Sequence, residues 1–409
     1  MKGQVTLFKK NDPFQKYKKV LFEFIINILS FSILIIVQQL LALPIISRFY
    51  HVDIFGQIIL AFGISNIITS MFGFSIGNAR LLDQKSYNYT YLRLLNFSNF
   101  LAMIIGFIVY ILIFPGDYVG GGFYSVVCAL GNIRYFLISE YRLRNDHNWI
   151  LNQNIVYFLG IIIGIILFNF YLKNWLIIFL FAEIASVITS YYFLFAKEGF
   201  LKLFVDKSRL SLTNSYQLMI NNGVSYSLSQ YDRFVIYPIL GASNVSLYYS
   251  TSISARIGSL IMNPMSNFFL GKLANKNSEI RKKTVYMVIL SSIVVVLSYF
   301  LLTIGITPIL IKILYPSFLT KVKHLILPIC LGTALMGGIN LLKPVVMKYK
   351  GVKYYNKLFI MYGFVLVFLS VILSIKYGLL GIAIANVISN ALLYFYLLFG
   401  LKFLPPRKM

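Results

Sequence analysis

Apolar residues fall in long runs along this chain, and short polar segments separate the runs. Most runs reach the roughly 20 residues that a helix needs to cross about 30 Å of hydrocarbon. Strands of a membrane barrel would be about 10 residues long with strict alternation, which these runs lack. The pattern therefore predicts about twelve membrane-spanning helices, at 22–46, 54–79, 95–115, 119–139, 150–171, 174–196, 214–240, 244–271, 284–308, 324–347, 356–376 and 379–401.

A polar, lysine-rich segment at 197–213 divides these spans into six and six. Because six is even, both halves would insert in the same orientation, which allows a repeat about an axis along the membrane normal. We therefore expect an all-α polytopic membrane protein with an N-terminal lobe at 1–205 and a C-terminal lobe at 206–409.

The composition narrows the class of protein further. Of the 409 residues, 59% are hydrophobic and 12% are charged, against about 45–50% and about 25% in an average soluble domain. The net charge of +25 would suggest a nucleic-acid-binding protein if the chain were soluble. Too few polar residues remain to cover a soluble globule, so we expect neither a soluble enzyme nor a nucleic-acid partner. Cys128 and Cys330 lie in distant apolar runs, as packing residues do.

The basic residues indicate the orientation in the membrane. Of the 37 Lys and Arg residues, 27 fall at the termini and in the alternate loops on their side, and 6 fall on the opposite side. The positive-inside rule therefore predicts that both termini are cytoplasmic, which requires an even number of spans. The first apolar run is longer than the core of a signal peptide, so we interpret it as an uncleaved span.

Apart from Glu23, Lys357 and Lys376 at the very ends of spans, six charged residues fall inside the predicted spans: Arg134, Arg233, Arg256, Lys343, Glu183 and Asp232. A charge at the centre of a lone helix costs about 3 kcal/mol, so such residues normally face a bundle interior or a wet cavity. Arg256 lies too far from either end of its span to reach an interface. It either pairs with Glu183 or Asp232, or it holds an anion such as phosphate, which a planar guanidinium binds through two oxygens.

The 214–240 span is unusually polar, with Asn, Gln, Ser and Tyr on more than one face. Asp232 and Arg233 are neighbours, about 100° apart on a helix, so each needs its own partner. The uncharged polar side chains could hydrogen-bond and stack against a sugar, or they could hydrogen-bond neighbouring helices. Both interpretations stay open at this point.

The other candidate residues also have two interpretations each. Glu183 could carry a coupling ion, a proton or sodium, as could Asp232, or it could pair with Arg256 or Arg233. Arg134 and Lys343 lie within about two turns of a cytoplasmic end and could reach the interface instead. Arg48 and Arg80, at the ends of the first two spans, could gate a cavity or anchor the helices at the membrane surface.

Motifs of enzyme chemistry are weak or missing in this sequence. Gly73 to Gly77 fits the nucleophile-elbow pattern, but it lies in an apolar helix without the strand–turn–helix context of that motif. Close helix packing through GxxxG explains the same spacing. The sequence contains no Walker A loop, no HExxH and no CxxC, and the predicted outer loops are short. We therefore expect no catalytic residue, no metal site and no cofactor.

Several stretches resemble the Wzx-type O-antigen flippases, a branch of the polysaccharide-transporter family in the MOP superfamily. The resemblance runs nearly end to end and is carried by loose patterns together with their order, the length and the twelve spans. The carrying stretches are LPIISRFYHVDIFGQ at 43–57, GFSIGNARLL at 73–82, RYFLISEYRLRNDHNWILNQNIVYFLGIIIG at 134–164, YDRFVIYPILGASNVSLYYSTSISAR at 231–256 and the turn at 348–351.

This resemblance implies two six-helix lobes around a central cationic cavity, as in MATE and other MOP proteins. It implies alternating access in the bacterial inner membrane, with an undecaprenyl-diphosphate-linked oligosaccharide as substrate. Membrane lipids and other O-antigen assembly proteins, such as the polymerase, are the implied partners. Carried over by position, Arg48, Arg80 and Arg256 would be cavity arginines. We add the hypothesis that the diphosphate binds Arg256 with help from Arg233 and Arg134.

Two other classes of protein compete with this interpretation. A MATE-like exporter of cationic drugs would share the fold, but an arginine-rich interior is a poor environment for a cation. An O-antigen polymerase or ligase would share the pathway, but it would need larger outer loops than this chain provides.

Overall fold

The computed structural model describes residues 30, 32–82, 88–144, 146–198, 212–258, 262, 266 and 282–402. Every regular element in these ranges is a helix. The lysine-rich N-terminus and the predicted lobe boundary at 205/206 lie outside the described residues.

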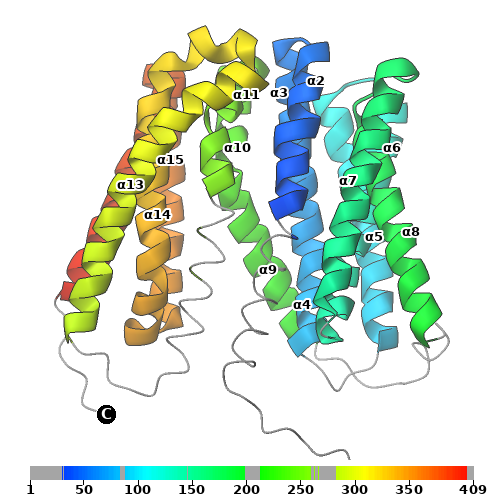
Figure 1. Cartoon of the computed structure of the whole chain (residues 1–409), viewed down its shortest axis with the longest axis horizontal. Helices are drawn as coiled ribbons and strands as arrows, with labels where there is room; N and C mark the ends of the chain where they lie inside the picture. The colour runs from blue at the N-terminus through cyan, green and yellow to red at the C-terminus, as the bar shows by residue number, and fades with distance from the viewer. Residues whose placement is uncertain are drawn as a thin grey trace, which may run out of the picture.

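The first half of the chain forms a series of long rods joined by short turns (Figure 1). A helical stretch from Ser32 contains the π-helical segment η1 (Val37–Ala42) and continues as α2. The second rod likewise contains a π-helical segment, η2, between α3 and α4. The bounds are α2 Leu43–Phe49, α3 Val52–Thr69, η2 Ser70–Phe74, α4 Ser75–Leu82, α5 Asn88–Ile113, α6 Tyr118–Leu143, α7 His147–Phe170 and α8 Leu176–Glu198.

The second half begins with broken, polar helices and ends with long apolar ones. The elements are α9 Leu212–Ser229, α10 Tyr231–Leu240, α11 Ala242–Thr251, α13 Lys282–Leu314, the short 3-10 helix η4 Pro316–Phe318, α14 Leu319–Lys350 and α15 Val352–Lys402. Gly241 has φ +88°, which lets the chain reverse between α10 and α11. Gly378 has φ 60° and ψ −139°, so α15 consists of two helices that meet at this residue.

Nine helices in the described part of the chain are long and apolar enough to cross a membrane. The break at Gly378 divides one of them, Lys353–Leu401, into two passes. The polar α9–α10 rod and the shorter α11, which continues as helix over 253–258, lie at the predicted spans 214–240 and 244–271, and most of 259–271 lies outside the described residues. The protein is therefore a polytopic, multi-pass membrane protein, as the apolar runs predict.

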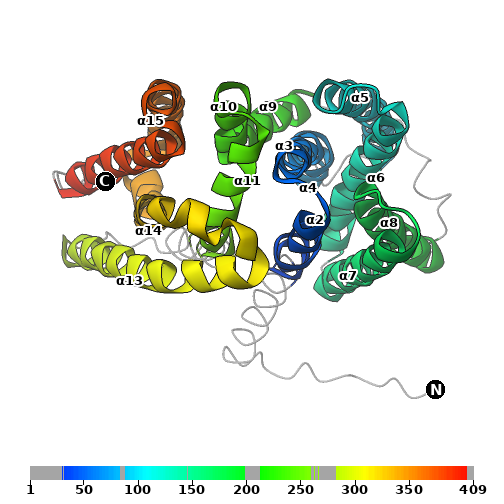
Figure 2. The same cartoon turned by 90° about the horizontal axis from the view of Figure 1, so that it is seen from above.

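The rods form two groups with a seam between them (Figures 1 and 2). Helices α2 to α8 lie on one side and α13 to α15 on the other, with α9, α10 and α11 between them. Helix α11 packs along α3, and α9 packs along η2 and α4. A Cβ on Gly56 of α3 would collide with the backbone oxygen of Ala242, so glycine is what permits this close approach.

Candidate functional site

A polar cavity of about 830 Å³ lies in the seam between the two groups of helices. This volume is at the upper end of the range for pockets that bind small ligands. Its wall comes mainly from α9–α10, from α11 with the helix that continues it, and from α14, and α15 completes it. The lining residues are Ile35, Gln39, Asn222, Ser225, Tyr226, Ser229, Gln230, Tyr231, Asp232, Tyr248, Ser252, Ala255, Arg256, Ser266, Ile329, Thr333, Met336, Asn340, Lys343, Tyr355, Phe359 and Asn386.

Arg256 lies in the wall of this cavity and contacts a carboxylate. Its Nη2 atom is 3.5 Å from Oδ2 of Asp232 and 3.3 Å from Oγ of Ser252. The guanidinium lies over the ring of Tyr249, 4.2 Å from the ring centroid. The Arg256 and Asp232 side chains keep 15% and 10% of their surface exposed. Of the partners that the sequence left open for Arg256, the structure selects Asp232, in a long contact rather than the bidentate fork.

Lys343 on α14 is the second cation in the cavity wall. Its Nζ atom lies 5.6 Å from the centroid of the Tyr355 ring, a cation–π distance. Among the described lining residues, two cations therefore face one carboxylate, Asp232. That charge balance favours an anionic occupant over a cationic one.

The polar face of α9 supplies a further wall of the cavity. Asn222, Ser225, Tyr226 and Ser229 recur at the three- and four-residue spacing of one helix face, and all four line the cavity. The Asn222 amide also donates a hydrogen bond to Oγ of Ser75 at 2.8 Å, which fixes α9 against α4. One polar face of the 214–240 span thus lines a cavity, and Asn222 on this face also bridges to a neighbouring helix.

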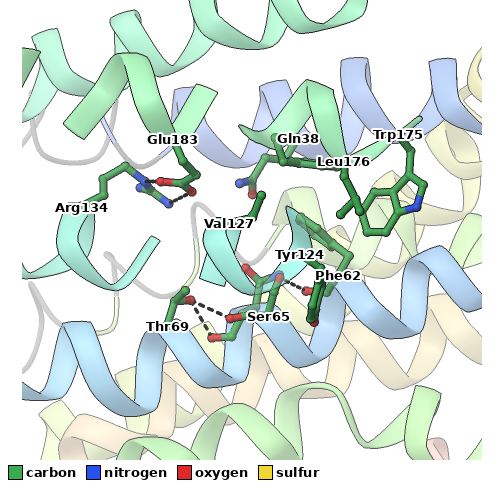
Figure 3. A pocket seen from close by; sticks show the side chains of 12 residues that line it. Gln38, Phe62, Ser65, Thr69, Tyr124, Val127, Arg134, Trp175, Leu176 and Glu183 are labelled. Carbon is green, nitrogen blue, oxygen red and sulfur yellow. Dashed lines mark hydrogen bonds and ion pairs between the residues drawn. The ribbon is translucent and has the colours of Figure 1, made fainter. Parts of the chain in front are cut away.

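Arg134 lies in a different place, inside the first group of helices (Figure 3). Its Nε and Nη2 atoms donate to the two carboxylate oxygens of Glu183 at 2.7 and 3.1 Å. The rings of Tyr135 and Tyr157 lie 4.5 and 4.7 Å from the guanidinium carbon. Only 2% and 6% of the Arg134 and Glu183 side chains are exposed. The adjoining pocket of about 30 Å³, which Gln38 also lines, has room for little more than water.

This geometry corrects two expectations about the first group. Arg134 does not extend to the cytoplasmic interface, because its bidentate partner holds it in the helix bundle. Glu183 pairs with Arg134 rather than with Arg233 or Arg256, because α6 and α8 pack together inside the same group of helices.

Arg233 also lies outside the cavity. It is 2% exposed, and its Nη1 atom donates to the carbonyl oxygen of Ile59 on α3 at 3.0 Å. A Cβ on Gly63 would collide with this guanidinium, so the missing side chain makes room for it. Asp232 and Arg233 diverge as adjacent helix positions must: Asp232 faces the cavity, and Arg233 fastens α10 to α3.

Arg48 and Arg80 lie at opposite ends of the first group, and neither lines the cavity. The Arg48 Nη2 atom donates to the carbonyl oxygen of Ile313 at 3.4 Å, which joins α2 to α13. Arg80 contacts Glu140 of α6 at 3.5 Å. Of the six candidate cations, Arg256 and Lys343 line the cavity, and the other four contact neighbouring helices.

The seam is closed at the end that the charge distribution predicts to be outside. There the Ser246 hydroxyl donates to the carbonyl oxygen of Val52 at 2.6 Å, across the seam. The ring of Phe55 lies 6.0 Å from Tyr315 and 6.4 Å from Phe318, both in the second group. At the other end the cavity wall reaches Lys343 and Tyr355, near the turn at 351 that is predicted to be cytoplasmic.

Among the cavity-wall residues that sequence reasoning did not single out are Gln39, Asn340, Tyr355 and Asn386. The three amides, Gln39, Asn340 and Asn386, each interrupt an apolar run, and this interruption is the sequence feature that could have identified them. Gln38 and Gln39 both fall in the π-helical segment η1. Gln38 turns into the first group, where it donates to the Tyr157 hydroxyl at 2.8 Å, and Gln39 lines the central cavity. Segments of this kind often occur at functional sites.

The fold is shared with solved structures of membrane transporters. A multidrug resistance MATE family transporter of the MOP superfamily, in its inward-facing conformation, superposes with a TM-score of 0.68 at 14% identity, over 91% of this chain and 95% of that chain. An outward-facing structure of such a transporter gives 0.64 at 14% identity, over 93% and 96%. The lipid II flippase MurJ aligns at 0.49, with 16% identity over 94% and 87%, and does not contribute to the fold assignment. No family model and no curated protein sequence matches this chain.

These superpositions define the class of architecture. The chain has a MOP-like polytopic membrane fold, in agreement with the expected fold class.

Proposed function

We propose that this protein is a flippase that moves an undecaprenyl-diphosphate-linked oligosaccharide from the inner to the outer leaflet of the bacterial inner membrane. The observation that carries the proposal is the content of the 830 Å³ cavity: Arg256 and Lys343 together with a wall of Tyr, Asn, Ser and Gln side chains. A diphosphate needs the cations, and a glycan needs hydrogen-bonding groups and aromatic faces.

In this mechanism the diphosphate displaces Asp232 from Arg256 and accepts the two parallel N–H hydrogen bonds of a bidentate contact. The sugars occupy the polar space along α9 and α14, and the polyprenyl chain stays in the lipid. Opening of the contacts at Val52–Ser246 and Phe55–Tyr315, with closure at the other end, would then expose the cargo to the outer leaflet. An inside-negative potential assists an anion outward by about 2.3 kcal/mol per charge per 100 mV.

The competing transport function is export of a cationic drug, by analogy with the multidrug resistance transporters that share the fold. The cavity disfavours it, because a drug cation would meet Arg256 and Lys343 beside a single described carboxylate. An enzymatic polymerase or ligase would need a reactive group at the glycan, and we assign none to this wall.

Proteoliposomes containing the purified protein test the proposal directly. Undecaprenyl-diphosphate-linked oligosaccharide is supplied in one leaflet, and its arrival in the other is followed by accessibility to an added lectin. We expect Arg256→Ala to slow flipping at least roughly tenfold, because truncation of one charged partner commonly costs more than 1.4 kcal/mol. Arg93→Ala, at an exposed arginine of α5, should flip at the wild-type rate.

Full-rate flipping by Arg256→Ala or Arg256→Lys would refute the assignment of the site. A protein that exports ethidium but leaves the lipid-linked oligosaccharide in place would belong to the drug-exporter class instead.

A further inference from the structure

A second, apolar groove of about 500 Å³ lies on the other side of α9 from the central cavity. Its wall comes from both groups of helices: Ile67 and Met71 on the first side, α9 and α10 in the middle, and Val367 of α15. The complete lining is Ile67, Met71, Ile220, Gly223, Val224, Ser227, Leu228, Tyr231, Phe234, Val235 and Val367.

The groove lies at the depth of the bilayer centre. Ile67 is midway along the rod of α3, η2 and α4, and Val367 is well inside the first half of α15. Ile220 and Val224 of α9 are exposed on the protein surface, so the groove faces the surroundings of the protein rather than its interior. At this depth those surroundings are hydrocarbon.

Helix α9 separates two environments of opposite polarity. The face with Asn222, Ser225 and Ser229 lines the cavity, and the face with Ile220, Gly223, Val224, Ser227 and Leu228 lines the groove. Tyr231, just after α9, lines both spaces. A tyrosine offers an apolar ring to one side and a hydroxyl to the other, which suits a boundary between a wet and an oily compartment.

The gap between α9 and α15 is filled by one side chain, that of Leu228. A Cβ on Gly363 would stand 3.0 Å from the Leu228 side chain, so the glycine lets that side chain fill the gap. Tyr355 and Phe359, earlier on α15, line the cavity, whereas Val367, later on the same helix, lines the groove. Leu228 is partly exposed, and a change of its rotamer would widen the gap between α9 and α15.

We propose that this groove holds the first isoprene units of the substrate's polyprenyl chain, and that the chain leaves the cavity past Tyr231 across the α9–α15 seam. This proposal rests on the proposed function, because the diphosphate in the cavity is what brings the chain to the seam. Ordinary lipid tails are as apolar as the groove, so apolarity alone selects nothing. A chain tethered to a bound headgroup has a high effective concentration at the groove and displaces the free lipid tails.

The test compares two diphosphates that differ in chain length, undecaprenyl diphosphate and methyl diphosphate, which has no isoprene unit, by their dissociation constants for the protein in lipid nanodiscs. Val367→Trp and Val224→Trp each place a bulky ring in the groove, from opposite walls. Val365→Trp is the matched control, because Val365 is 38% and Val367 is 36% exposed on the same helix, and Val365 does not line the groove.

We expect Val367→Trp and Val224→Trp to weaken binding of the long-chain probe roughly fivefold, since the interaction is van der Waals packing, and to leave binding of methyl diphosphate unchanged. Val365→Trp should bind both probes like wild type. If both groove variants keep the wild-type affinity for undecaprenyl diphosphate, the groove does not hold the chain. Arg256→Ala should weaken the binding of both probes to the same extent. If the wild-type protein binds neither probe, the proposed function is wrong, and the assignment of the groove is wrong with it.

Discussion

The two halves of the molecule each hold an arginine beside an acid. The two pairs differ in their contact distance, in their exposure and in the size of the adjoining cavity. Arg134 and Glu183 meet in a bidentate fork at 2.7 and 3.1 Å, with 2% and 6% of their side chains exposed, beside a pocket of about 30 Å³. Arg256 and Asp232 meet at 3.5 Å, with 15% and 10% exposed, in the wall of an 830 Å³ cavity.

The difference shows how one pair of residue types can serve two purposes. In the first pair each charge satisfies the other, and two tyrosine rings enclose the guanidinium. In the second pair the contact is long and the cavity gives an anion access to the guanidinium. We therefore interpret the first pair as structural and the second as the exchangeable part of a binding site.

The largest expected effect is on stability, at the enclosed pair. Arg134→Met or Glu183→Leu alone should lower the free energy of unfolding by about 3–5 kcal/mol, because each leaves a buried charge without its partner. The double variant, which is apolar and similar in volume, should recover most of that loss. Unfolding of the detergent-solubilised protein measures all three, and single variants as stable as wild type would contradict the structural interpretation.

The next largest effect is on binding, at the cavity pair. Arg256→Met should weaken binding of geranyl diphosphate at least roughly tenfold, which is about 1.4 kcal/mol, while the free energy of unfolding changes by less than about 1 kcal/mol. The two quantities come from a binding titration and from the same unfolding assay. If Arg256→Met lowered the free energy of unfolding as much as Arg134→Met does, the distinction between the two pairs would be wrong.

A smaller effect in the opposite direction is expected at the acid. Asp232→Asn keeps the size of the side chain and removes the competing negative charge, so geranyl diphosphate should bind roughly threefold to tenfold more tightly. Glu183→Gln is the comparison, because Glu183 does not line the cavity, and it should not tighten binding. Tighter binding in both variants would indicate a general change of net charge rather than competition for Arg256.

The smallest effect concerns the second cation. Lys343→Met should weaken binding roughly twofold to threefold, since an ammonium acts as a point charge and forms no bidentate fork with a phosphate. The same titration measures it. A loss as large as that of Arg256→Met would move the main anion contact towards α14.

Much of the fold follows from the sequence, because hydrophobic length alone fixes where a helix can cross a membrane. The spans at 119–139 and 324–347 correspond to α6 and α14, and the polar 214–240 span corresponds to the α9–α10 rod. The breaks between helices could not be predicted from hydropathy. The turn at Gln230 and the reversal at Gly378 depend on backbone angles, which hydropathy does not record.

Less of the candidate site could be predicted, because charge partners depend on tertiary packing. The sequence identified the charged residues inside the spans and the neighbouring, diverging positions of Asp232 and Arg233. It did not reveal that Arg134 and Glu183 lie on packed helices of one group, or that Arg233 donates to a carbonyl of α3. Those contacts join residues 49 and 174 positions apart, beyond the range of any helical spacing rule.

The central claim is that the diphosphate occupies the cavity at Arg256, and an experimental structure of the protein bound to an undecaprenyl-diphosphate-linked oligosaccharide tests it most directly. We predict phosphate oxygens about 3 Å from the Arg256 guanidinium, with Asp232 displaced and the Arg134–Glu183 pair intact. A diphosphate bound elsewhere, with the contact between Arg256 and Asp232 unchanged, would contradict the account.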